Sequence, residues 1–230
     1  MSLVLVTGAS RGIGRAIVSR FVAGGCTVVA CARPGPSLEA LGADFPGVDC
    51  VPCDMRDEAA VDALARSVLE RHGVPDLLVN NAGQYRPGRI SEEADDALLD
   101  MLQANLFGAY RLTRRLLPGM VARRSGTIIN MCSVASIAAY PDGGSYSIAK
   151  HALHGFSRNL REEMKPHGVR VVALLPGATL TSSWDGVELP EDRFMPAADV
   201  AEVAWSAWKM SARTVVEDIV MRPQLGDLGS

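Results

Sequence analysis

The fold of this chain is decided by the stretch Leu3-Val4-Leu5-Val6-Thr7-Gly8-Ala9-Ser10-Arg11-Gly12-Ile13-Gly14. A short apolar run leads into a turn that contains three glycines, and apolar residues then recur at helical spacing from Arg15 to Ala23. The apolar run is typical of a strand buried on both faces, as in a parallel sheet. Glycines allow positive φ in a tight turn, and the free N–H groups at the start of a helix attract an anion. The stretch therefore predicts a strand, turn and helix whose backbone can approach a pyrophosphate.

The rest of the chain continues this alternation of strands and helices. Further strands are expected near 27–32, 49–53, 76–80, 127–131, 170–175 and 217–221, and helices near 58–72, 93–115, 145–165 and 199–211. The sequence therefore predicts a doubly wound α/β fold, with a parallel sheet of about seven strands flanked by helices on both faces. No linker or repeat divides the chain, so residues 1–230 are expected to form a single domain. Residues 177–198 lack clear periodicity, which indicates a substrate lid loop.

Composition and charge exclude several classes of protein. With 230 residues, of which 48% are hydrophobic and 21% charged, the chain can bury a core without disulfides or metals, and intrinsic disorder is excluded. The net charge of −3 provides no positive field for nucleic acid or an anionic membrane. The chain shows neither a membrane-spanning apolar run nor a signal peptide, and its five cysteines are an odd number among apolar neighbours. We expect a cytoplasmic protein with reduced thiols that binds neither nucleic acid nor membrane.

Further motifs follow the glycine turn in a fixed order. They are Asp54 after the third strand, Asn80-Asn81-Ala82-Gly83 after the fourth, Asn105 in the next helix, Ser133 after the fifth strand, Tyr146-Ser147-Ile148-Ala149-Lys150, and Pro176-Gly177 with Thr181 after the sixth. With the TGxxxGxG turn, this series resembles the short-chain dehydrogenase/reductase family over nearly the whole chain. The resemblance implies a Rossmann fold and an NAD(P)-dependent oxidoreductase, with dinucleotide binding and catalysis in one domain over 1–230.

The resemblance also implies which residues bind the cofactor. Asp54 and Met55 would meet the adenine, and Asn81 to Gly83 would line the ribose side of the cleft. Thr181 would approach the nicotinamide amide or the pyrophosphate. The full implied set is Gly8, Ser10, Arg11, Gly12, Ile13, Gly14, Arg33, Asp54, Met55, Asn81, Ala82, Gly83, Tyr146, Lys150, Pro176, Gly177, Thr179 and Thr181.

The end of the second expected strand discriminates between NADP and NAD. An acidic residue there would bind the ribose 2′-hydroxyl of NAD and repel the 2′-phosphate of NADP. This chain has Ala32-Arg33 at that position and no acid. Arg33, together with Arg11, offers guanidinium groups suited to a phosphate, although both could be solvated surface charges. We expect NADP(H) to be favoured over NAD(H).

The pair Tyr146 and Lys150 points to acid–base catalysis. The two residues are four positions apart, so on a helix they share one face. A nearby ammonium and a cationic nicotinamide would favour the phenolate of a tyrosine whose ordinary pKa is about 10. By the resemblance, Tyr146 protonates the carbonyl oxygen during reduction, and Ser133 hydrogen-bonds that oxygen. Lys150 would also hold the nicotinamide ribose, and Asn105 would support a bound water in a proton relay.

The segments that flank these residues supply candidate substrate contacts. They are Gln84, Tyr85, Ala135, Tyr140 and Trp184, and they lean apolar and aromatic. This favours a neutral or apolar carbonyl compound, although Arg86, Arg89 and Arg193 could receive an acidic tail. We expect NADPH-dependent reduction of a ketone or aldehyde to an alcohol. The alternatives are an NAD-linked alcohol dehydrogenase, a 3-oxoacyl thioester reductase and, more remotely, a non-catalytic NADP-binding regulator.

Two tempting features do not predict a metal site. Cys50-Val51-Pro52-Cys53 has the C-x-x-C form but lacks a second ligand pair, and His151 with His154 does not complete a ligand set. No metal is expected. The expected partner is a small-molecule carbonyl or alcohol substrate. The resemblance further implies a homodimer or homotetramer formed through the helices near 93–115 and 145–165.

Overall fold

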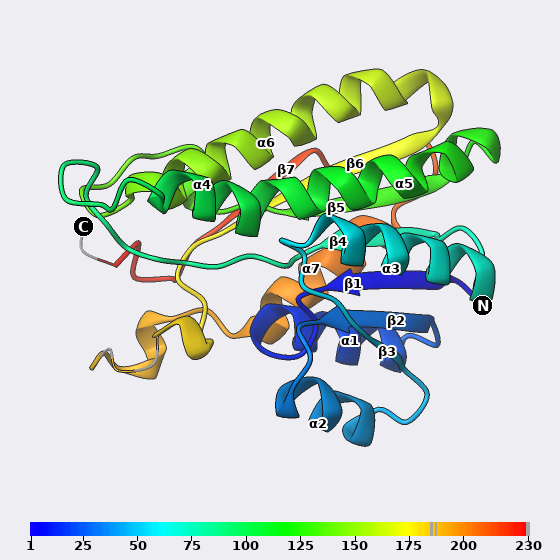
Figure 1. Ribbon diagram of the computed structural model, residues 1–230, viewed down its shortest axis with the longest axis horizontal. Helices are drawn as coiled ribbons and strands as arrows, with labels where there is room; N and C mark the ends of the chain where they lie inside the picture. Colours follow the sequence, from blue (N-terminus) through cyan, green and yellow to red (C-terminus); the bar gives the residue numbers. More distant parts are fainter. Residues whose placement is uncertain (185, 187, 229–230) are drawn as a thin grey trace.

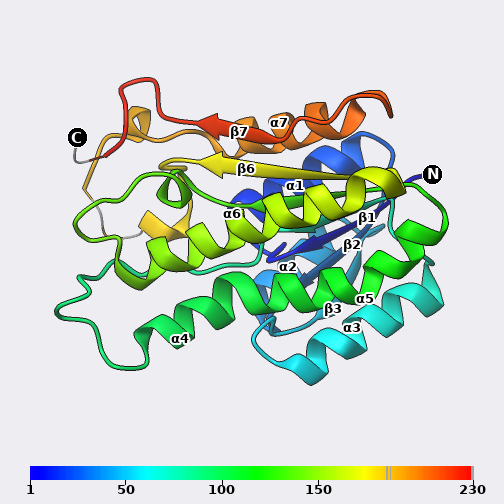
Figure 2. The same cartoon turned by 90° about the horizontal axis from the view of Figure 1, so that it is seen from above.

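The computed structural model describes residues 1–184, 186 and 188–228, and Figures 1 and 2 show a central sheet between two layers of helices. The strands are β1 (Leu3–Thr7), β2 (Thr27–Ala32), β3 (Asp49–Pro52), β4 (Leu77–Asn80), β5 (Gly126–Met131), β6 (Val169–Pro176) and β7 (Asp218–Met221). All pair in parallel, in the order β3-β2-β1-β4-β5-β6-β7. The predicted doubly wound fold is confirmed.

The helices are α1 (Gly12–Ala23), α2 (Pro36–Asp44), α3 (Glu58–Arg71), α4 (Ala97–Leu102), α5 (Gly108–Ala122), α6 (Gly144–Met164) and α7 (Ala197–Lys209). Shorter turns are η1 (Gln103–Phe107), η2 (Val134–Ser136), η3 (Lys165–His167), η4 (Ser182–Trp184) and η5 (Glu191–Arg193). The helix expected over 93–115 instead spans α4, the π-helical turn η1 and α5. It extends past Pro118, a residue type that normally interrupts a helix.

The core lies on both faces of the sheet, because side chains alternate along each strand. On one face, Val4 and Val6 of β1 join the cluster formed by α1 and α7. On the other face, Leu3 and Leu5 join the cluster formed by α3, α5 and α6. In Figure 2, α3, α4 and α5 accordingly lie on one side of the sheet and α7 lies on the other. All of β1 is buried, as its continuous apolar run predicts.

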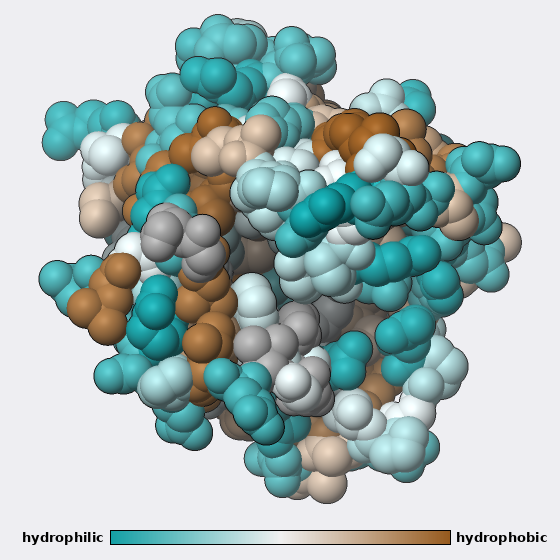
Figure 3. Space-filling view, turned by 90° about the vertical axis from the view of Figure 1, so that its left-hand side faces the viewer, coloured by the Kyte–Doolittle hydropathy of each residue, from teal (hydrophilic) through white to brown (hydrophobic). Residues whose placement is uncertain are grey.

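The parallel arrangement gathers the carboxyl ends of the strands at one edge of the sheet. The chain leaves β1 for β2 on one side and returns to β4 on the other, which creates the switch point where such sheets bind ligands. The glycine turn, Gly83, Ser133 and Gly177 all follow strands at this edge. Figure 3 looks onto this side of the molecule, where the surface is hollowed near its centre and hydrophobic and hydrophilic residues meet.

The described residues also bear on the cysteines and on membrane insertion. All five cysteines are unpaired, and Cys50 lies on β3 with Cys53 just beyond it. Within residues 1–184, 186 and 188–228, no helix is both long and apolar enough to cross a membrane.

Candidate functional site

The glycine turn is compact, and its glycines have no room for a side chain. Gly8 and Gly12 adopt φ values of 63° and 54°, in the left-handed region that favours glycine. A Cβ on Gly8 would lie 2.7 Å from Ala82 Cα, and one on Gly14 would lie 2.3 Å from the Gly8 carbonyl oxygen. The first N–H groups of α1 have no acceptor within the helix, so they can face an anion. This cradle fits the pyrophosphate of a dinucleotide.

The cradle is fixed to the end of β4 by two side chains. Asn81 Nδ2 donates to the carbonyl oxygens of Thr7 (2.9 Å) and Gly8 (3.1 Å). Thr7 Oγ1 accepts hydrogen bonds from the backbone N–H groups of Asn81 (3.0 Å) and Ala82 (2.9 Å). Four hydrogen bonds therefore join the two loops. Thr7 was not among the expected site residues, although its place at the end of β1, directly before the turn, could have marked it.

An arginine follows each of β1, β2 and β3 at the edge where the sequence predicts the cofactor. Arg11 and Arg33 are exposed, and Asp54 binds Arg56 through an ion pair of 2.7 Å between Oδ2 and Nη2. The hydrogen bond from Arg56, with a smaller contribution from the charge of Arg33, lowers the pKa of Asp54. Arg56, which no motif in the sequence indicates, is thus a second cation that acts on Asp54 together with Arg33. The side chain of Met55 points into the core, so only its backbone is available to a ligand.

Tyr146 and Lys150 lie one helical turn apart on α6, near the strand edge. Lys150 is buried, and its Nζ lies 5.8 Å from the centroid of the Tyr146 ring. Nζ donates to the carbonyl oxygen of Met131 at 2.9 Å. Burial lowers the pKa of Lys150 to about 8. A Cβ on Gly83 would lie 3.4 Å from Nζ, so the loop after β4 passes directly over the lysine.

The environment of Tyr146 keeps its phenol protonated. Burial raises the pKa of Tyr146 to about 12, and the hydrogen bond with Ser133 opposes this only in part. Desolvation of the phenolate is the largest contribution to this shift, and Lys150 is not among its causes. Ser133 caps η2, and its Oγ accepts from the Ala135 N–H at 3.1 Å. Tyr146 and Ser133 therefore meet as a protonated donor and its hydroxyl neighbour.

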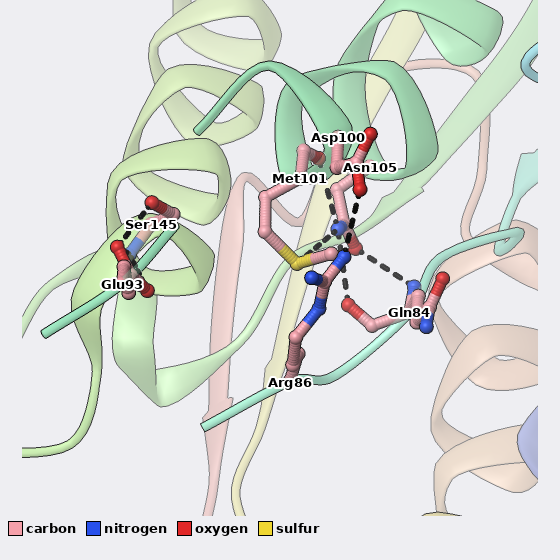
Figure 4. Close-up of polar contacts among 7 residues, drawn as sticks. All are labelled: Gln84, Arg86, Glu93, Asp100, Met101, Asn105 and Ser145. Atoms are coloured by element: carbon pink, nitrogen blue, oxygen red, sulfur yellow. Dashed lines mark hydrogen bonds and ion pairs between the residues drawn. The ribbon is translucent and has the colours of Figure 1, made fainter. Parts of the chain in front are cut away.

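Asn105 is buried in the π-helical turn and clamps the backbone of Gln84 (Figure 4). Its Oδ1 accepts from the Gln84 N–H at 3.1 Å, and its Nδ2 donates to the Gln84 carbonyl oxygen at 3.0 Å. Nδ2 also donates to the Met101 carbonyl oxygen at 3.0 Å. A Cβ on Gly83 would lie 2.6 Å from Asn105 Oδ1, so the clamp requires glycine there. The Asn105 side chain thus holds the segment after β4.

A second clamp holds the other end of that segment (Figure 4). The Glu93 carboxylate accepts from the Ser145 N–H at 2.9 Å and from Ser145 Oγ at 2.5 Å. A Cβ on Gly144 would lie 2.3 Å from the same carboxylate. Glu93 therefore secures the start of α6, one residue before Tyr146. The sequence does not indicate this role, because an acidic residue at the start of an expected helix is equally consistent with solvation.

The expected substrate residues contribute a row of aromatic rings beside Tyr146. The Tyr85 ring lies 5.0 Å from the Tyr146 ring, edge to face, and 5.7 Å from the Trp184 ring. The Trp184 ring in turn lies 5.3 Å from the ring of Phe194, a residue that was not among the expected substrate contacts. Burial raises the pKa of Tyr140, and a hydrogen bond with Tyr85 adds to the effect. These rings line one side of the site.

Two other expected substrate residues, Gln84 and Ala135, contribute no aromatic ring. Gln84 is exposed, and Ala135 is buried with its carbonyl oxygen bound by Ser147 Oγ at 2.9 Å. Two arginines considered for an acidic tail already have carboxylate partners. Arg86 pairs with Asp100 at 3.0 Å, and Arg89 pairs with Asp142 at 2.9 Å.

The predicted lid, 177–198, is anchored at both ends. Thr179 and Met195 form an isolated parallel β-bridge, and Thr179 Oγ1 donates to the Gly177 carbonyl oxygen at 3.0 Å. A Cβ on Gly12 would lie 3.0 Å from Thr181 Cγ2, so the lid begins directly over the glycine turn. Asp185 and Val187 of the predicted lid lie outside the described residues.

Known proteins share this architecture. A family model described as short chain dehydrogenase matches residues 2–191. The chain is 32% identical to a sepiapterin reductase from Chlorobaculum tepidum, and the alignment covers 98% of each chain. An actinorhodin polyketide ketoreductase solved with NADPH is 30% identical, with a TM-score of 0.89 over 98% of this chain and 97% of that one. An alcohol dehydrogenase from Thermococcus sibiricus, complexed with 5-hydroxy-NADP, is 26% identical, with a TM-score of 0.92 over 100% of both.

Proposed function

Because the chain belongs to the short-chain dehydrogenase family, we propose that it is an NADP(H)-dependent reductase of ketones or aldehydes in which Tyr146 donates the proton. The family and the similar ketoreductase make the protein an NAD(P)-dependent oxidoreductase. The single observation that carries the proposal is the placement of Tyr146, Lys150 and Ser133 together at the strand edge where the glycine cradle opens.

The residues at the cradle fit a dinucleotide phosphate. A side chain does not fit at Gly14, and the positive φ of Gly12 disfavours one there. A phosphate can therefore approach the backbone of the turn closely. Exposed Arg33 and Arg11 support a preference for NADP(H), because guanidinium groups attract a 2′-phosphate. When bound, the nicotinamide of NADPH supplies the hydride.

Tyr146 would donate its phenolic proton from Oη to the substrate carbonyl oxygen. The raised pKa keeps that proton in place until the carbonyl oxygen gains negative charge. Ser133 Oγ, beside the same hydroxyl, would hydrogen-bond and orient the carbonyl. Lys150, with a pKa of about 8, carries a positive charge at neutral pH and would stabilise the phenolate that Tyr146 becomes. Asn105 would act by holding the loop over Lys150.

We propose that residues 1–230 act as a single dinucleotide-binding and catalytic domain, with 177–198 as its substrate lid. Exposed apolar side chains on α4, α5 and α6 support a homodimer or homotetramer; they include Leu99, Tyr110 and Ile148 at 52%, 43% and 42% exposure. The unpaired cysteines support a reducing compartment such as the cytoplasm.

The test is a screen of NADPH oxidation, with NADH in parallel, against aldehydes, ketones, diketones, quinones and 3-oxoacyl thioesters. We expect turnover of ketones or aldehydes with NADPH. Preference for thioesters would support the 3-oxoacyl alternative, and faster alcohol oxidation with NAD would support the dehydrogenase alternative. Cofactor binding without turnover of any compound would contradict the proposal and favour a non-catalytic regulator.

A further inference from the structure

Three segments border Tyr146, and each brings an aromatic side chain toward it. Tyr85 follows the loop after β4, Tyr140 precedes α6, and Trp184 lies in the predicted lid. We call Tyr85, Tyr140, Trp184 and Phe194 the aromatic wall. The ring centroids run from Tyr146 to Tyr85 (5.0 Å), from Tyr85 to Trp184 (5.7 Å) and from Trp184 to Phe194 (5.3 Å). Residues far apart in sequence thus form one continuous row that ends at the proposed proton donor.

The wall is supported by rigid neighbours. Asn105 binds both backbone groups of Gln84, which fixes the chain immediately before Tyr85. The Tyr140 carbonyl oxygen accepts from the Gly143 N–H at 3.0 Å, which holds Tyr140 against the start of α6. Phe194 is buried at the far end, with 7% exposure. A binding surface held in this way loses little conformational freedom when a ligand docks.

The chemistry of the wall selects for flat rings more than for charge. Arg86 and Arg89, which follow Tyr85 in the chain, are each paired with a carboxylate, so their charge is already balanced in part. Aromatic faces and edges attract other aromatic rings, and each such contact strengthens binding by up to about tenfold beyond the burial of area. Trp184 and Tyr85 are partly exposed, which leaves ring surface available to a ligand.

We propose that the substrate is an aryl ketone or aryl aldehyde, whose planar ring packs against Tyr85 and Trp184 while its carbonyl meets Tyr146. The inference rests on the proposed function. It assigns Tyr85 and Trp184 as the residues that select an aromatic group over an aliphatic group of similar size.

The test compares two methyl ketones of similar shape, 2-acetylnaphthalene and its fully saturated bicyclic analogue. With NADPH, we expect the wild-type kcat/KM to be at least about tenfold higher for the aryl ketone. Tyr85→Leu and Trp184→Leu should each reduce this ratio about fivefold to tenfold without changing KM for NADPH. Tyr85→Phe is the matched control, because it keeps the ring, and it should preserve the ratio. Equal rates for the two ketones in the wild-type enzyme, or an unchanged ratio in both leucine variants, would overturn the inference.

A binding measurement separates this inference from the proposed function. Equilibrium dialysis of both ketones against the wild-type protein loaded with NADP⁺ does not require turnover. Tighter binding of the aryl ketone that is lost in Tyr85→Leu supports the aromatic wall, even if no ketone is reduced and the proposed function fails. Equal binding of the two ketones overturns the inference, even if both are reduced.

Discussion

Glu93 holds the first turn of α6 through Ser145, whose backbone N–H lies 2.9 Å from Glu93 Oε1. The second carboxylate oxygen accepts from Ser145 Oγ at 2.5 Å. Fifty-two positions separate the two residues in the sequence, so this is a tertiary cap and not a local one. Because Tyr146 follows Ser145 directly, the cap helps to fix the orientation of the Tyr146 phenol.

Replacing Glu93 should therefore impair the chemical step more than cofactor binding. Glu93→Ala leaves the Ser145 N–H without its acceptor, and we expect kcat to fall about tenfold and stability to fall by about 1 kcal/mol. KM for NADPH should stay near the wild-type value. Glu93→Gln, which keeps one acceptor oxygen, should recover much of kcat. Steady-state kinetics and thermal unfolding check both effects, and an equal loss in the Gln and Ala variants would contradict the cap.

The same carboxylate predicts a dependence of stability on acid pH. Hydrogen bonds from Ser145 lower the pKa of Glu93 in the folded protein. Its contribution to stability is therefore complete above the pKa of the unfolded chain, and it is lost as pH falls through the lower folded value. The difference in unfolding free energy between wild type and Glu93→Gln should shrink as the pH is lowered through that range. Urea unfolding at several pH values measures it, and a constant difference would exclude the effect.

Tyr146→Phe should remove the proton donor while leaving the ring in place. We expect turnover to fall by roughly 100-fold to 10,000-fold, which is the range for loss of a general acid. NADPH affinity, measured by fluorescence titration, should stay close to wild type because the variant removes only Oη. Rapid turnover in this variant would show that another group delivers the proton.

Lys150 predicts how activity changes with alkaline pH. Its pKa is lowered by burial to about 8, so the ammonium is present at neutral pH and is lost as pH rises through that value. We expect kcat/KM for NADPH to decline above about pH 8 in the wild-type enzyme. In Lys150→Arg the guanidinium stays charged throughout this range. The pH profile of kcat/KM for that variant should therefore lack the decline, whatever its absolute rate. A flat wild-type profile between pH 7 and 9.5 would contradict this role.

Regular alternation made most of the fold predictable from sequence. β1 is apolar at every position because both faces are covered, and α3 and α6 follow their apolar periodicity closely. α2 was missed because it buries only Leu38 and Leu41, too few for a recognisable stripe. The π-helical turn at Gln103–Phe107 could not be predicted, because it shifts the backbone hydrogen bonds while the sequence keeps a helical pattern of residues.

Site residues could be predicted from the sequence where spacing along one helix sets their geometry. They could not be predicted where contacts between distant segments set it. The four-residue spacing of Tyr146 and Lys150 places both on one face of α6. Glu93 could not be identified, because an acidic residue in a polar stretch is equally consistent with solvation. The pKa of Tyr146 depends on burial by neighbouring segments, which spacing along α6 does not reveal.

Arg33 provides the sharpest test of cofactor preference, because it is exposed and contributes little to the core. If it binds the 2′-phosphate, Arg33→Ala should raise KM for NADPH about tenfold, as expected for loss of one charge-assisted hydrogen-bonding group, and leave KM for NADH nearly unchanged. Arg66→Ala on α3 serves as a matched control, since it removes the same charge from a different element. The increase in KM should shrink at high salt because free ions screen an exposed cation. Equal losses for NADPH and NADH would instead mean that Arg33 acts on a part of the cofactor common to both.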